Sequence, residues 1–246
     1  MIRDLRTVIW KEWRSVRNGR ARRQIVLMIT VLSDFAIISP ISLGQDWATD
    51  PVMMLIQAVI LPMVVVGVVV PDAIAGERER HTLSTLLASR LPDRAILYGK
   101  LGFAVAFGWI LAPFVLAIAL VAANLAAIDA APFFYDPLML VGALILALLV
   151  ALMTGGIGIF ASLRAPGVQE AQQMTLLGLM IPVMLGTVGM VLIGSNPELG
   201  RRVLDWLGSA EAGYAFAGVV VLIAVVDAVL LLAADRRFRR GRLALL

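Results

Sequence analysis

Residues 76–100 read Gly-Glu-Arg-Glu-Arg-His-Thr-Leu-Ser-Thr-Leu-Leu-Ala-Ser-Arg-Leu-Pro-Asp-Arg-Ala-Ile-Leu-Tyr-Gly-Lys and lie between two long apolar stretches. Charged residues crowd the start of this insert, and its leucines follow the i, i+3, i+4, i+8 spacing of one helix face: Leu83, Leu86, Leu87 and Leu91. Pro92 is expected to end that helix, because proline removes a backbone donor and clashes with the preceding turn. The pattern predicts a short amphipathic helix on the membrane surface. A solvated loop with internal salt bridges is the alternative.

The composition around the insert is that of a membrane protein. Hydrophobic residues make up 61% of the 246 residues and charged residues 15%, whereas soluble proteins average about half and about a quarter. Six stretches are apolar over about the 20 residues that a helix needs to cross a bilayer: 24–42, 52–75, 101–125, 138–163, 172–194 and 213–234. Lipid admits only helices and closed barrels, and no alternating barrel strands are visible. The predicted fold class is an all-α membrane protein with six transmembrane helices.

Basic residues predict how the chain is oriented. Lys and Arg number eight in 1–23, five in 76–100, one in 164–171 and five in 235–246, which leaves only Arg201 and Arg202 of the 21 for the alternate loops. Because basic residues favour the cytoplasmic side, both termini and the insert are expected in the cytoplasm, which requires an even number of spans. One domain, 1–246, then divides into spans one and two (24–75), the cytoplasmic insert (76–100), spans three to six (101–234) and a cytoplasmic tail (235–246).

Residues 1–23 are expected to form an amphipathic helix at the membrane surface. Apolar side chains recur at helical spacing, and most of the basic ones lie elsewhere on the helical wheel: the apolar set is Leu5, Val8, Ile9, Trp13 and Val16. Tryptophan suits the headgroup layer and arginine attracts anionic membrane lipids. The helix is predicted to lie on the cytoplasmic leaflet, either as an anchor or as a contact for a partner protein.

Several kinds of chemistry are excluded by residue content. The chain has no cysteine and a single histidine, His81, so thiolate zinc sites, histidine clusters and histidine-based triads are not expected. A phosphate-binding P-loop needs Gly-x-x-x-x-Gly-Lys-Ser/Thr, and the only Gly-Lys pair, Gly99-Lys100, has neither the earlier glycine nor the following hydroxyl. The basic residues border apolar spans and form no nucleic-acid patch. No catalytic residue, metal site or cofactor is predicted within this chain.

Two aspartates lie inside predicted spans, Asp34 in the first and Asp227 in the last. Ionisable residues are costly in a bilayer and often mark a substrate or ion pathway. Both are therefore candidates for the lining of a translocation path. The alternative is that each one bonds to a neighbouring helix or faces water.

The insert resembles the cytoplasmic coupling region of ABC-2 type transporter permeases, which joins the second and third spans. The matching order is Ala75-Gly76-Glu77-Arg78-Glu79-Arg80, Thr82-Leu83, Leu86-Leu87, Pro92 and Gly99-Lys100. The predicted topology is similar to that family along nearly the whole chain. His81 departs from the pattern, because the family more often has glycine before the threonine.

The resemblance implies a permease subunit, not an enzyme, of an exporter in the bacterial cytoplasmic (inner) membrane. Two copies, or this chain and a paralogue, would form the path. A separate P-loop ATPase subunit, with ATP and Mg, would bind the insert. The residues implied in ATPase coupling are Glu77, Arg78, Glu79, Arg80, Thr82, Leu83, Leu86 and Leu87.

Two other classes of protein remain open on the sequence. An ion-gradient-driven secondary transporter would use Asp34 and Asp227, although the two halves of the chain show no convincing inverted repeat. A membrane-embedded enzyme is disfavoured, because no paired acid–base or metal constellation is visible. Dependence on a cognate ATPase separates the permease from both.

Overall fold

The computed structural model describes residues 2–18, 21–43, 50–82, 88–126, 131–207 and 209–238. Within these ranges every regular element is a helix, which confirms the all-α prediction. The helices are α1 (Ile2–Asn18), α2 (Ala21–Leu43), α4 (Pro51–Glu79), α6 (Asp93–Ala126), α7 (Pro137–Arg164), α8 (Val168–Ser195), α9 (Pro197–Leu207) and α10 (Ala210–Arg237).

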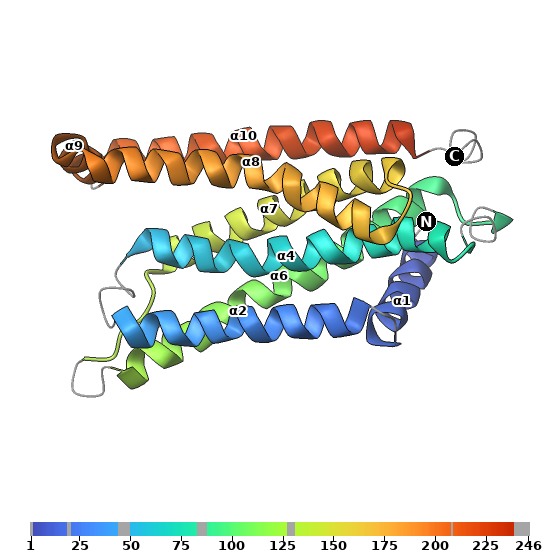
Figure 1. Cartoon of the computed structure of the whole chain (residues 1–246), viewed down its shortest axis with the longest axis horizontal. Coiled ribbons are helices and arrows are strands. Elements are labelled where there is room, and N and C mark those ends of the chain that lie inside the picture. Colours follow the sequence, from blue (N-terminus) through green and yellow to red (C-terminus); the bar gives the residue numbers. More distant parts are fainter. Residues whose placement is uncertain are drawn as a thin grey trace.

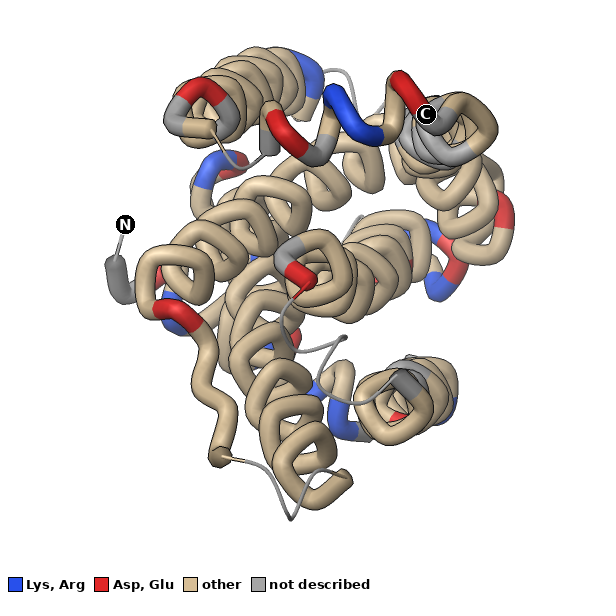
Figure 2. Tube along the Cα trace, turned by 90° about the vertical axis from the view of Figure 1, so that its left-hand side faces the viewer, with Lys and Arg blue, Asp and Glu red and all other residues tan. Residues whose placement is uncertain are grey.

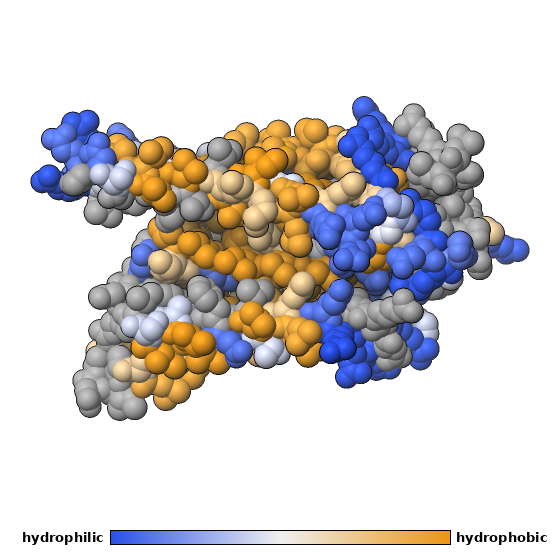
Figure 3. Space-filling model, in the orientation of Figure 1, coloured by the Kyte–Doolittle hydropathy of each residue, from blue (hydrophilic) through white to orange (hydrophobic). Residues whose placement is uncertain are grey.

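The long helices lie side by side in a bundle, with α1 across one end and α9 at the other (Figure 1). We call the end that carries α1, residues 80–82 and 88–92 and the end of α10 the basic end. Hydrophilic residues gather there, whereas the middle of the molecule is hydrophobic (Figure 3). Viewed along the bundle, the helices are mostly uncharged tubes with charged residues near their ends (Figure 2). This distribution fits a protein whose middle lies in lipid.

Five described helices are long and apolar enough to cross a membrane, which supports a multi-pass membrane protein. They are Arg22–Ser42, Val52–Glu79, Asp93–Ala126, Pro137–Arg164 and Gly213–Arg237. The predicted span 172–194 falls within α8, a helix of 28 residues, but several of its side chains lie outside those described. A count of six spans therefore stays a prediction.

The insert is less separate from the spans than its sequence suggests. The second-span helix, α4, continues through Gly76 to Glu79, and α6 begins at Asp93, so that residues 93–100 belong to a span helix. Three of the four leucines that define the predicted amphipathic helix, Leu83, Leu86 and Leu87, lie outside the described residues. A separate coupling helix therefore stays a prediction.

His81 ends α4 in the left-handed region, with φ of 56°. The N–H of His81 donates to the carbonyl of Arg78 at 3.0 Å, and the N–H of Thr82 donates to the carbonyl of Glu77 at 2.9 Å. These two bonds form a Schellman cap, whose left-handed position glycine fills most readily. His81 therefore occupies the position of this cap that glycine usually fills.

Helix α4 lies at the centre of the bundle and contacts α2, α6, α7 and α8. Five of its valines are buried almost completely: Val65, Val66, Val68, Val69 and Val70. Small residues on neighbouring helices allow close approach, which supplies much of the association energy in lipid. A Cβ on Gly108 of α6 would lie 2.7 Å from a methyl of Val66 and 3.2 Å from the carbonyl oxygen of Pro62.

Close packing at Gly108 predicts that Gly108→Ala destabilises the bundle by about 1–3 kcal/mol, because the added methyl meets backbone as well as side chain. Gly102, on the same helix, is a matched control, since a Cβ there has nothing within 4 Å. Gly102→Ala is expected to leave the melting temperature unchanged or to raise it. Thermal unfolding of the detergent-solubilised variants measures both. Equal melting temperatures for the two variants would contradict the packing account.

The helix directions predict that Glu198 in α9 and Ser89 near the basic end lie on opposite sides of the membrane (Figure 1). Because the chain has no cysteine, Glu198→Cys and Ser89→Cys each introduce a single thiol. A membrane-impermeant maleimide should label Glu198→Cys in intact cells and Ser89→Cys only after the membrane is opened. Labelling of both from the same side would mean that α8 does not cross the bilayer.

Candidate functional site

The 77–80 stretch (Glu77, Arg78, Glu79 and Arg80) closes α4 at the basic end. Its side chains reach different neighbours. Arg78 donates to the carbonyl of Ser162 on α7 at 3.2 Å, and Glu79 accepts from the N–H of Val168 at the start of α8 at 3.2 Å. Arg80 pairs at 3.3 Å with Asp72, which lies about two helical turns earlier on the same side of α4. The stretch therefore fastens the ends of two spans to α4.

Glu77 belongs to a buried ion network. The ammonium of Lys100, on α6, lies 2.7 Å from an oxygen of Glu12 on α1 and 2.8 Å from an oxygen of Glu77. It also donates to the carbonyl of Ala73 at 2.7 Å, and Lys11 bonds to Glu77 from the outside. The side chains of Lys100, Glu12 and Glu77 are only 4%, 5% and 6% exposed. The network joins α1, α4 and α6 in one place.

Helix α1 is packed tightly where this network forms. A Cβ on Gly99 would lie 2.7 Å from a methyl of Val8, so only glycine allows α1 so close to α6. One turn on, the ring of Trp13 meets Phe103 and Phe107 edge-on, with centroids 6.5 and 6.4 Å apart. The Gly99-Lys100 pair therefore has two structural tasks, since its glycine admits α1 and its lysine binds α1.

The third predicted span, in α6, and the last one, in α10, meet at the same end. Arg94 at the start of α6 donates to both carboxylate oxygens of Asp235 near the end of α10, at 3.1 and 3.0 Å. This geometry is the bidentate pairing that guanidinium and carboxylate favour. Together with the 77–80 stretch, it ties every described span helix of the basic end except α2 through charged side chains.

The residues implied in ATPase coupling therefore occupy different environments. Glu77 is buried, whereas Glu79, Arg80 and His81 are exposed. The hydroxyl of Thr82 donates to the carbonyl of Glu77 at 3.2 Å and reinforces the helix cap. Leu83, Leu86 and Leu87 lie outside the described residues. The coupling role of this set stays a prediction, and Glu77 would serve in it by holding helix ends rather than by touching a partner.

A polar cleft of about 1430 Å³ lies beside the 77–80 stretch. Its residues come from α1 and α2 on one side, from α8 and the residue before it on the other, and from α4 and Arg80 between them: Arg14, Ser15, Arg23, Gln24, Asp72, Glu79, Arg80, Gly167, Val168, Gln169, Glu170, Gln172, Gln173 and Leu176. Helix α4 runs between α2 and α8 (Figure 1) and contacts both, so it forms the floor of the cleft. Sequence reasoning missed this cleft, because its walls are distant in the chain.

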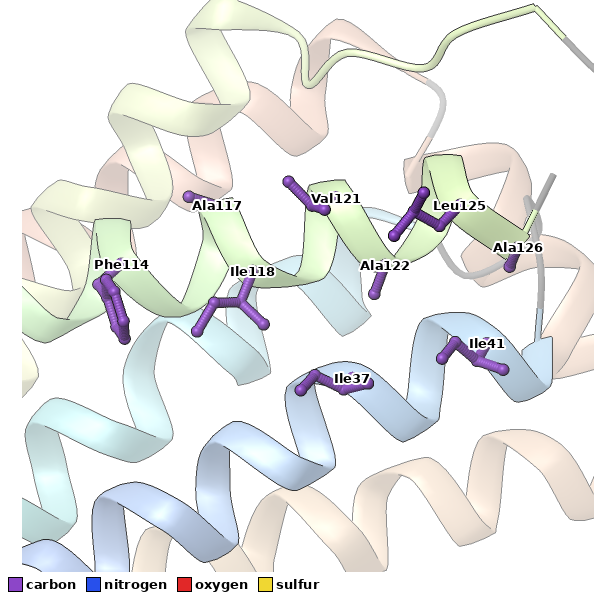
Figure 4. Close-up of a pocket in the computed structure, with 9 residues that line it drawn as sticks. All are labelled: Ile37, Ile41, Phe114, Ala117, Ile118, Val121, Ala122, Leu125 and Ala126. Atoms are coloured by element: carbon purple, nitrogen blue, oxygen red, sulfur yellow. The ribbon is translucent and has the colours of Figure 1, made fainter. Parts of the chain in front are cut away.

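A second cavity is an apolar groove of about 590 Å³ between α2 and α6, towards the end of the bundle opposite the basic end (Figure 4). All nine lining residues are hydrophobic, among them Ile37, Ile41, Phe114 and Val121. The groove presents no side-chain hydrogen-bonding group, so it suits a hydrocarbon chain and cannot orient a polar molecule.

The two intramembrane aspartates are not brought together. Asp34 is exposed on α2, which packs on α4 and α6, whereas Asp227 lies on α10, which packs on α7. Asp227 is only 3% exposed, and neither of its carboxylate oxygens has a hydrogen-bond partner in the described part of the chain. The structure therefore does not place the two carboxylates at one ion site.

No protein-family model matches the sequence, and no curated protein resembles it closely enough to count as a relative. Across the described residues, no group of three or more His, Cys, Asp and Glu side chains could hold a metal ion. The function of the basic end is therefore inferred from the contacts of its own residues.

The ion network predicts that Lys100→Met destabilises the fold by about 3–5 kcal/mol, because Glu12 and Glu77 would stay buried without their shared cation. Lys11→Met is the matched control, since Lys11 is 47% exposed and its loss should cost about 1 kcal/mol or less. Adding Glu12→Gln and Glu77→Gln to Lys100→Met should recover much of the loss.

Folded yield and melting temperature in detergent measure these effects. If Lys100→Met and Lys11→Met lower the melting temperature by the same small amount, the network is not a buried structural element.

Proposed function

We propose that the chain is the permease subunit of an ATP-driven ABC-2 type transporter, and that this transporter is an exporter. The observation that carries the proposal is the 77–80 stretch, which ties α4 to α6, α7, α8 and α1 next to an exposed turn. A partner that moves this turn would move the ends of several spans together. The resemblance of the same residues to an ABC-2 coupling region supports this assignment.

The proposed mechanism is mechanical, because the proposal assigns the chemistry of ATP hydrolysis to a separate chain. A P-loop ATPase subunit binds ATP and Mg and docks on residues 76–92. Its closure pushes the exposed turn, and the ion network passes the movement to α1 and α6. Rigid helices joined at one end convert such a push into a change at the other end.

In this proposal the basic end faces the cytoplasm of a bacterium, with both termini inside and six spans across the inner membrane. The 28 residues of α8 extend about 40 Å at the helical rise, more than the hydrocarbon thickness of about 30 Å, which supports α8 as the additional span. A second copy or a paralogue completes the path. Asp34 supports this arrangement, because an exposed carboxylate on a span is expected to face protein or water rather than lipid.

An ion-gradient-driven secondary transporter is the second candidate. Asp227 favours it, since a buried carboxylate without a partner in the described chain is a natural proton or cation site. The separation of Asp34 from Asp227 on different sides of the bundle weighs against coupling through both.

Co-purification in mild detergent from the native host tests the permease proposal. We expect a P-loop ATPase with the wild-type chain and much less of it with Leu83→Asp/Leu87→Asp, which alters the proposed docking segment but leaves the ion network intact. Arg201→Ala/Arg202→Ala, at the opposite end of the bundle, is the control and should retain the ATPase.

Two results would contradict this proposal. If the wild-type chain is folded and monodisperse but brings no ATPase, ion-driven transport through Asp227 becomes the leading function. If the docking variant retains as much ATPase as the control, the partner binds elsewhere.

A further inference from the structure

The polar cleft contains a basic and an acidic side chain that have no partner among the described residues. Arg23 and Glu170 line it, and neither makes an ion pair or a hydrogen bond with any described residue. Arg23 stands at the start of α2 and Glu170 in the first turn of α8, on opposite walls. A ligand that carries both an anion and a cation would complement the two walls.

The other charged groups of the cleft are largely engaged within the protein. Asp72 pairs with Arg80, and Glu79 accepts from the N–H of Val168. The guanidinium of Arg14 is held over the ring of Trp10 at 4.1 Å, which fixes its plane and leaves its N–H edges free to donate. The wall formed by α1 and α2 is therefore positive, whereas the wall formed by α8 offers a carboxylate.

Exposed apolar side chains follow the cleft residues along both α2 and α8. Leu27 and Val31, further along α2, are 55% and 63% exposed, and Leu177 and Ile181, further along α8, are 67% and 63% exposed. These positions lie inside the bilayer if the apolar helices span it, because the span on α2 starts at Arg22. A ligand of the cleft would thus have its polar part in the headgroup layer and its apolar part between α2 and α8.

We propose that the cleft between α2 and α8 binds the zwitterionic headgroup of an ethanolamine phospholipid. Arg14 and Arg23 bind the phosphate, for which guanidinium is the best-matched side chain. The carboxylate of Glu170 accepts from the primary ammonium. Gln24, Gln169 and Gln173 supply amides for the remaining phosphate and ester oxygens. The volume of about 1430 Å³ holds the headgroup with bound water.

The chemistry of the walls excludes close alternatives. A phosphatidylglycerol headgroup has no cation for Glu170 and would bring a net negative charge towards it. A choline headgroup carries a cation without N–H groups, so it cannot donate to the carboxylate. A soluble zwitterion would leave the apolar faces of α2 and α8 uncovered. Binding does not depend on an ATPase, but the further statement that this lipid is the exported cargo rests on the proposed function.

The test is equilibrium binding of a phosphatidylethanolamine labelled on an acyl chain to the full-length chain in detergent, followed by fluorescence anisotropy. Phosphatidylglycerol and phosphatidylcholine with the same label are compared. The wild type should bind the ethanolamine lipid most tightly. Glu170→Gln should weaken that lipid about tenfold and abolish the preference, whereas Arg23→Gln should weaken all three lipids about tenfold.

Arg202→Gln is the matched control, because it removes an exposed arginine at the opposite end of the bundle and should change no affinity. Size-exclusion chromatography confirms that each variant is folded. The proposal is overturned if the wild type binds the three lipids equally, or if Arg23→Gln and Glu170→Gln bind as the wild type does. An equal loss in Arg202→Gln also overturns it, since binding would then be non-specific.

If an ATPase co-purifies with the chain but the chain shows no lipid preference, the lipid site is contradicted and the transporter proposal is still supported. A preference for the ethanolamine lipid without a co-purifying ATPase would support the lipid site and contradict the transporter proposal.

Discussion

The ammonium of Lys100, buried between the carboxylates of Glu12 and Glu77, is the interaction on which the basic end depends. A buried cation is costly unless its partners are close and its donors are used, and here two carboxylates and the carbonyl of Ala73 surround it. The geometry requires α1 to lie against α6, which Gly99 permits. It also holds the end of α4 next to the turn of residues 80–82. Helices α1, α4 and α6 are thus held together by one ammonium group, that of Lys100.

The buried ion network also determines what the 77–80 stretch contacts. On the sequence its four charges suggested a surface for docking, but in the structure Glu77 faces inwards and Arg78 and Glu79 bind the ends of α7 and α8. The stretch is a joint between spans, next to the exposed residues 80–82 that remain accessible to a partner. The polar cleft opens beside the same joint, so a movement of the joint would also change the cleft.

The helices were predictable because long apolar stretches in lipid have few alternatives, and the ends of the spans near residues 24, 52 and 213 were placed within a few residues. The extension of α6 back to Asp93 was not predicted, because residues 93–100 were assigned to the cytoplasmic insert, although Arg94 pairs across the bundle with Asp235. Glu12 gave a signal that was overlooked, since it lies four residues from both Val8 and Val16 and so interrupts the apolar face of α1. The polar cleft and the separation of Asp34 from Asp227 depend on how the helices pack, which periodicity does not specify.

Amide hydrogen exchange on the wild-type chain and Lys100→Met, resolved by segment, tests the joint most directly. If one ion network holds α1, α4 and α6, the substitution should remove protection together from α1, from residues 73–79 and from the start of α6, while the centre of α7 stays protected. Loss of protection in α1 alone would contradict this account, because α1 would then be an independent surface helix and the 77–80 stretch would not depend on it.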